Sequence, residues 1–218
     1  MRSARAFAIL SCLFATLGEL PLAAAQGGDP STGSDEHEVG FYARLGLGFG
    51  GLYSEFDASD DFELSTAGIG IHGELAAGAK ITESLAVHAT GFLSSAIDPE
   101  FQVNSVDAPS DSDTVFLFWM AGAGLTYEFS NGIYASGSFG VSQVGIETET
   151  PLGDNIDAYS DAGFAALNSV GIEWAISDSL AAGVAANFFM SLNPIDDGEL
   201  DDTGLTLGGG LAGTISFD

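Results

Sequence analysis

The chain has 218 residues, with 31 Asp and Glu against 4 Lys and Arg, so its formal charge is −27, yet 46% of it is apolar. So few basic side chains exclude nucleic-acid binding, because almost nothing is available to neutralise phosphates. The mean hydropathy of +0.27 and the 16 Phe residues exclude the weakly apolar composition of a disordered acidic chain.

The first 25 residues have the three regions of a cleaved secretory signal peptide. Arg2 and Arg5 give a positive start, residues 6–17 form a short apolar run, and three alanines ending at Ala25 form a small-residue cleavage site. The apolar run is too short for a membrane-spanning helix. Cleavage would remove the only cysteine, Cys12, and with it any thiol chemistry. It would also remove two bases and one acid, which changes the formal charge from −27 to −28.

Residues 26–39 are polar and acidic and predict a flexible leader. From Gly40 to Asp218, large apolar residues alternate with Gly, Ala, Ser or Thr with a period of two, which indicates β-strands. Asn168 falls on an apolar face, so a bulge or a phase slip is predicted there. Eight strands are predicted, at residues 40–53, 64–79, 84–94, 114–129, 132–144, 162–176, 180–192 and 203–217.

The connections between these strands alternate between short and long. Short turns are predicted at 81–84, 130–132 and 177–179, and long loops at 54–62, 96–113, 147–161 and 193–202. A soluble lipocalin-like barrel would share this layout, but its outer face would carry charged residues. Here neither strand face is wettable and no amphipathic helix remains to cover one, so a closed barrel in lipid is favoured.

Two strand ends carry a similar motif, in which a Glu lies beside aromatic residues just before a short turn: Tyr127-Glu128-Phe129 and Glu173-Trp174. With the eight alternating strands over residues 40–218, the chain resembles the small eight-stranded outer-membrane barrels of Gram-negative bacteria, the OmpA/OmpX-like family. The resemblance implies a porin-like monomer in the bacterial outer membrane, with both ends in the periplasm and the long loops outside the cell. That family ends on an aromatic residue, whereas here Phe217 is followed by Asp218.

The long loops carry 19 of the 30 acids of the mature chain, counted over residues 57–63, 98–113, 147–161 and 196–202, and no Lys or Arg. This charge would repel anions and concentrate cations, so divalent cations or basic surface partners are candidate ligands. A weak divalent-cation site is one interpretation of Asp196, Asp197, Glu199, Asp201 and Asp202, because hard cations prefer carboxylate oxygens. A solvated loop is the favoured alternative, because no EF-hand spacing is present.

Four charged residues are predicted to face the lumen and to form an interior charge cluster: Arg44, Glu74, Glu128 and Glu173. Unpaired charges there would be costly, so a network around Arg44 is expected. A structural plug is the favoured interpretation, and a gate or proton-linked pore is the alternative. An eight-stranded lumen is just wide enough for side chains to fill it, and Phe92, Phe116 and Tyr134 are expected to contribute.

No catalytic residue is predicted. His88 and Thr90 face inward, as does His72 beside Glu74, and His37 lies in the leader. Neither Gly-x-Ser-x-Gly nor a Ser-His-Asp arrangement can be argued. We therefore expect no enzyme, no cofactor and no specific metal site. The expected role is structural, adhesive or surface recognition through the acidic extracellular loops. The alternatives are a small cation-selective channel and, less favoured, a lipid-modifying outer-membrane enzyme.

Overall fold

The computed structural model describes residues 40–59, 62–104, 106–108, 114–149, 155–196 and 201–217, so the predicted signal peptide and leader lie outside it. Within these residues every regular element is a strand: β1 Gly40–Ser59, β2 Phe62–Thr82, β3 Leu85–Ile97, β4 Glu100–Val103, β5 Val106–Ala108, β6 Thr114–Glu128, β7 Ile133–Glu149, β8 Asn155–Tyr159, β9 Gly163–Ser177, β10 Leu180–Asp196 and β11 Asp201–Phe217. Over the same residues, no helix has the length and apolar character needed to cross a membrane.

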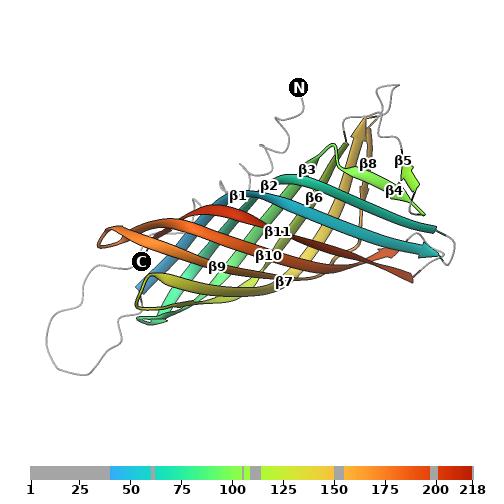
Figure 1. The fold of residues 1–218 in the computed structure, drawn as a ribbon. Helices are drawn as coiled ribbons and strands as arrows, with labels where there is room; N and C mark the ends of the chain where they lie inside the picture. Colours follow the sequence, from blue (N-terminus) through green and yellow to red (C-terminus); the bar gives the residue numbers. More distant parts are fainter. Residues whose placement is uncertain are drawn as a thin grey trace, which may run out of the picture. The chain divides into compact units, whose positions relative to one another are not determined.

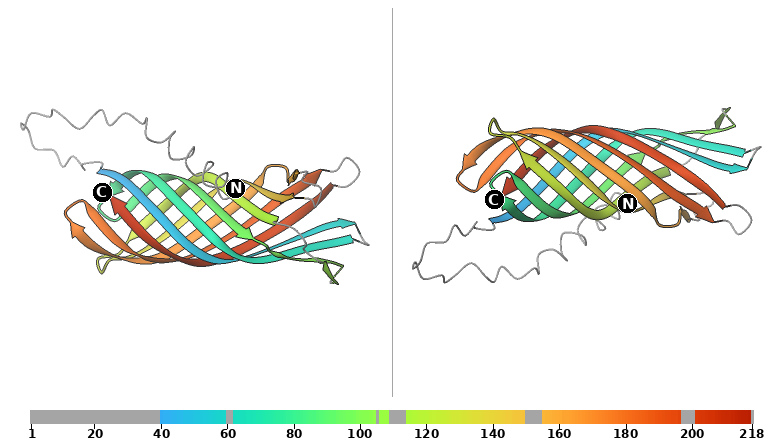
Figure 2. Two further views of the ribbon diagram at one scale, coloured as in Figure 1. Left: turned by 90° about the horizontal axis from the view of Figure 1, so that it is seen from above. Right: turned by 90° about the horizontal axis from the view of Figure 1, so that it is seen from below.

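Eight of the described strands close into an antiparallel barrel (Figure 1). Their ring order is β1, β2, β3, β6, β7, β9, β10 and β11, and the pairing of β11 with β1 completes the ring. The register of the barrel is found by following directly paired residues from Gly48 of β1 around the ring. In the direction of β2 these pairs reach Val144 of β7, and in the direction of β11 they reach Tyr134 of the same strand. The two end points differ by ten residues. This offset tilts the strands by about 40° from the barrel axis, and Figure 2 shows their oblique course. The predicted all-β, eight-stranded antiparallel up-and-down barrel is confirmed.

The strands extend further on the long-loop side than predicted. The predicted loop at 54–62 is mostly strand, because β1 and β2 stay paired until Ser59 opposite Phe62. Likewise β10 and β11 stay paired to Asp196 opposite Asp201. The other two predicted loops contain β4 and β5, which extend the sheet from β2, and β8, which pairs with β7. Beyond the lipid a strand no longer needs apolar residues, so the alternation that predicted these strands ends before their hydrogen bonds do.

The predicted bulge at Asn168 is wrong. β9 pairs without interruption with β7, from Ile133↔Ile172 to Ser142↔Gly163. Its register with β10 shifts only at Leu180/Ala181, at the short-turn end. Asn168 keeps the alternation of β9 and is an exposed polar residue on an apolar face, so its polarity does not reflect a phase slip.

Burial alternates along the barrel strands, so each strand has an outer and an inner face. In β3, for example, Val87 and Ala89 are exposed, whereas His88 and Thr90 are buried. The core therefore lies inside the barrel. Its largest cluster of apolar side chains comprises Leu52, Phe56, Phe92, Ala96, Phe116, Phe118, Met120, Val144, Ala165, Leu167 and Phe189.

Candidate functional site

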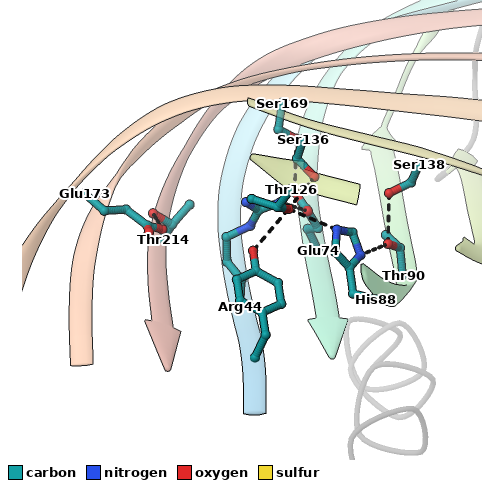
Figure 3. Close-up of polar contacts among 11 residues, drawn as sticks. Arg44, Glu74, His88, Thr90, Thr126, Ser136, Ser138, Ser169, Glu173 and Thr214 are labelled. Atoms are coloured by element: carbon teal, nitrogen blue, oxygen red, sulfur yellow. Dashed lines mark hydrogen bonds and ion pairs between the residues drawn. The ribbon is translucent and has the colours of Figure 1, made fainter. Parts of the chain in front are cut away.

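Among the described residues, a fully buried ion pair lies in the lumen, between Arg44 of β1 and Glu74 of β2 (Figure 3). Arg44 Nη2 donates to Glu74 Oε1 at 2.7 Å, and the two side chains are only 1% and 3% exposed. Ser169 Oγ of β9 donates to the other carboxylate oxygen at 3.3 Å. The guanidinium carbon lies 4.4 Å from the centre of the Tyr134 ring of β7. The pair thus joins β1, β2, β7 and β9 across the interior.

A hydroxyl network holds His88 beside this pair (Figure 3). Its Nδ1 lies 2.8 Å from Thr90 Oγ1, and its Nε2 lies 3.0 Å from Thr126 Oγ1. The network continues from Thr126 to Ser136 at 3.0 Å and from Thr90 to Ser138 at 2.9 Å. All five side chains are buried, so the arrangement fixes the ring in place between strands.

The structure brings together two of the four residues expected in the charge cluster, Arg44 and Glu74, but not the other two. Glu128 pairs instead with Lys80 at 2.8 Å, and both side chains are partly exposed. Glu173 accepts hydrogen bonds from the hydroxyls of Thr214 at 3.0 Å and Ser216 at 2.8 Å. Sequence reasoning missed Lys80 because the second strand was predicted to end at Ala79, although continued alternation would have placed Lys80 on the inner face.

Three aromatic rings occupy another part of the lumen. Phe118 stacks on Phe189 at 4.8 Å between ring centres, and Phe92 lies 5.0 Å from Phe189 and 6.1 Å from Phe118. The His72 ring lies 5.7 Å from Phe92. Each phenyl ring is at most 3% exposed. Phe92 and Phe116 were expected inside, and strand alternation would also have placed Phe118 and Phe189 there.

Glycines on the inner face make room for these rings. A Cβ at Gly208 would overlap the Phe189 ring, and one at Gly48 would lie 2.6 Å from His72 Nε2. Glycine in a strand commonly marks such a close approach. The glycines therefore determine where large rings can cross the lumen.

The outer face forms an apolar belt. On β1, the outward positions from Phe41 to Tyr53 hold only apolar residues or glycine, and the next outward residue is Glu55. Twelve residue steps at ~3.3 Å, with a tilt of about 40°, rise by about 30 Å, which is the thickness of the hydrocarbon core of a bilayer. At the short-turn end the belt carries exposed aromatic residues, namely Phe41, Tyr127, Phe129, Trp174 and Phe217.

Beyond the belt, the long hairpins place like charges opposite each other. Asp57 is paired with Glu63, Asp196 with Asp201, and Glu147 with Asp157. Glu147 also accepts a hydrogen bond from Tyr159 at 2.6 Å. Like charges at directly opposed positions of paired strands are destabilising.

The described residues include no group of three or more His, Cys, Asp or Glu that could hold a metal ion. Of the five residues of the predicted divalent-cation loop, Asp197 and Glu199 lie outside the described residues. Asp196, Asp201 and Asp202 are placed by their backbone at the ends of β10 and β11.

No protein-family model matches the chain, and no curated protein matches it at a significant level. Among solved structures, the chain is similar to Neisserial surface protein A, with 13% identity, 81% of this chain and 96% of that one covered, and a TM-score of 0.48. Ail of Yersinia pestis is 10% identical over 80% of this chain and 99% of its own, with a TM-score of 0.46. The outer membrane protein OprG of Pseudomonas aeruginosa is 10% identical over 83% and 97%, with a TM-score of 0.44.

The strand pairings and the outer surface of the chain define its class directly. A closed ring leaves no barrel strand without a partner, which satisfies backbone groups in lipid. The apolar belt matches the bilayer in height, and aromatic residues lie where interfacial girdles are found. The chain is therefore a transmembrane β-barrel of the outer-membrane type.

Proposed function

We propose that this barrel is closed to solutes and acts through its extracellular hairpins, in surface recognition or adhesion. The observation that carries the proposal is the contrast between a filled lumen and strands that continue past the belt. The packed aromatic side chains of Phe92, Phe118 and Phe189 occupy the lumen. A strand needs only about 9–11 residues to span the membrane, whereas β1 has 20 and β2 has 21.

The orientation follows from the two kinds of connection. Short turns at the ends of β2, β6 and β9 are typical of the periplasmic side, and long hairpins are typical of the outer side. An even number of barrel strands puts Gly40 and Phe217 at the short-turn end. The acidic hairpins would then face the cell exterior, where a basic partner surface or divalent cations would relieve the repulsion within them.

A small cation-selective channel is the second candidate, because acidic residues at the outer mouth would concentrate cations. The packed aromatic rings and the buried Arg44–Glu74 pair oppose it, since ions would have to pass both. Recordings in planar bilayers separate the two. A closed barrel gives no stable conductance above the lipid background, and a reproducible cation-selective step would replace our proposal with the channel.

A lipid-modifying enzyme is supported less, because His88 and Thr90 face the lumen and not the lipid. Comparing lipid A from cells with and without the protein tests it. Unchanged lipid A is the result we expect, and a new acylation or deacylation product would contradict us.

Surface recognition itself is tested with the protein in neutral lipid vesicles and a basic probe, polylysine. We expect binding that falls as salt rises, and weaker binding when Asp196→Asn and Asp201→Asn remove one opposed pair. A matched control, Asp178→Asn in the short turn between β9 and β10, should bind as the unaltered protein does. Equal binding by the hairpin variant would contradict recognition through these acids.

A further inference from the structure

Asn168 is an exposed polar residue on a mostly apolar outer surface. Over the described residues, the outward positions of the belt are every second residue in 41–53, 67–79, 85–97, 115–127, 133–145, 164–176, 180–192 and 205–217, and they hold glycine, alanine or larger apolar residues except at Ser95, Gln143 and Asn168. Ser95 is only 7% exposed, and Gln143 accepts a hydrogen bond from Trp119 and donates one to the Ser160 carbonyl. Asn168 therefore differs from both, because it is exposed and has no such contact. A polar side chain held at this depth against hydrocarbon marks a site of interaction.

Asn168 also lies far from both membrane surfaces. Along β9 it is six residues from Trp174 and four from Phe164, the aromatic residues nearest the two ends of the outward face of that strand. These separations correspond to about 15 Å and 10 Å along the barrel axis. An asparagine side chain is too short to reach water or headgroups over either distance.

The neighbours of Asn168 within its own chain offer it no hydrogen bond. Directly opposite lie Gly137 of β7 and Phe188 of β10, and neither side chain can donate or accept. The amide oxygen of Asn168 lies 3.6 Å from the position that a Cβ of Gly137 would occupy, so it faces the backbone of a residue that has no side chain. In the part of the chain that the structure describes, no hydrogen bond reaches this amide. Both its donor and its acceptor are therefore left to a partner outside the chain.

We propose that Asn168 joins two copies of this barrel side by side in the membrane. A primary amide has both a donor and an acceptor, so two asparagines facing each other satisfy both. A two-fold axis along the membrane normal relates copies inserted in the same direction and places the same residue on both sides of the contact. Each Asn168 then donates an N–H to the amide oxygen of the other. A second copy supplies this complement, whereas lipid chains supply neither group.

The surrounding surface allows the close approach that this contact needs. Gly137, Ala166 and Ala186 are the small residues next to Asn168 on the outer face. Beside them is an apolar hollow of about 710 Å³, whose lining includes Val170 and Val184. Small residues let membrane-spanning backbones approach closely enough for side chains to hydrogen-bond. This proposal departs from the monomer that the sequence resemblance implies.

The dimer is tested with full-length protein extracted from membranes and reconstituted at a series of protein-to-lipid ratios. Energy transfer between labelled copies should rise with this ratio. Asn168→Leu should raise the dissociation constant about three- to twentyfold, whereas Asn168→Gln, which keeps the amide, should retain most of the association. Ile71→Leu, on the opposite side of the barrel, is the matched control and should have no effect.

A disulfide experiment locates the contact. In a Cys12→Ser background, Ala166→Cys should give cross-linked dimers on oxidation, whereas Ile71→Cys should not. Transfer that is absent at every ratio, or equal in the unaltered protein and Asn168→Leu, would overturn the proposal. The inference rests on the transmembrane placement, which heat-dependent gel mobility tests separately, because it reports a folded barrel whether or not two copies associate.

Discussion

The buried Arg44–Glu74 pair gives the sharpest stability prediction. Arg44→Met keeps a long apolar stem but leaves Glu74, 3% exposed, with only the Ser169 hydroxyl at 3.3 Å. Removing one partner of a buried ion pair typically costs about 3–5 kcal/mol, because the other charge stays buried without compensation. Loss of the contact with the Tyr134 ring at 4.4 Å adds up to about 2 kcal/mol.

The double variant separates the worth of the pair from the cost of leaving one charge alone. Replacing both residues, as Arg44→Met with Glu74→Leu, removes both charges together, and such replacements are often neutral or stabilising. We therefore expect the double variant to unfold near the free energy of the unaltered barrel, although each single variant is several kcal/mol less stable. Lys80→Met is the control, because its partner Glu128 is 30% exposed, and its effect should be below about 1 kcal/mol.

Unfolding by urea in lipid vesicles measures these differences. The fluorescence of Trp119 and Trp174, which lie on outward positions of β6 and β9, follows the loss of the barrel. If the effects of the two single variants simply add in the double variant, to within about 0.5 kcal/mol, the two residues are not coupled. That result would refute the argument from a buried uncompensated charge.

Three further predictions use other parts of the barrel. Gly208→Ala should lower the free energy of unfolding by about 1–3 kcal/mol, because the added Cβ overlaps the Phe189 ring. Gly213→Ala is the control and should be neutral, because an added Cβ there meets open space. Equal effects of the two substitutions in urea unfolding would contradict the close-packing argument. Phe189→Ala should cost about 3–5 kcal/mol and produce a conductance in planar bilayers, because it removes the centre of the aromatic contacts; a stable variant that stays closed would show that other side chains block the lumen. Asp196→Asn should raise the free energy of unfolding by about 0.2–1 kcal/mol at low salt, since it relieves repulsion with Asp201; the gain should disappear at high salt, and a gain that persists would have another origin.

The sequence by itself was sufficient for the barrel and for the number of its strands. The two-residue alternation follows from strand geometry, and a chain with no wettable strand face has to close on itself in lipid. Alternation also placed Arg44, Glu74 and His88 on the inner face, because burial there depends only on strand parity. It did not show where the strands end, since paired strands outside the membrane no longer require apolar residues.

Tertiary structure decided which inward side chains meet. The ten-residue offset of barrel closure is a property of all eight strands together, and it brings Arg44 and Glu74 against Ser169 and Tyr134 from the far side of the ring. The same closure places Glu128 beside Lys80, and Glu173 beside the hydroxyls of Thr214 and Ser216. The single charge cluster expected from the sequence is therefore divided into separate contacts. Folding also explains how a chain with a formal charge of −27 can be 46% apolar. Its apolar residues form the belt and the aromatic interior, while opposed acids mark the hairpins beyond the belt, because only folding assigns each side chain to lipid, lumen or water.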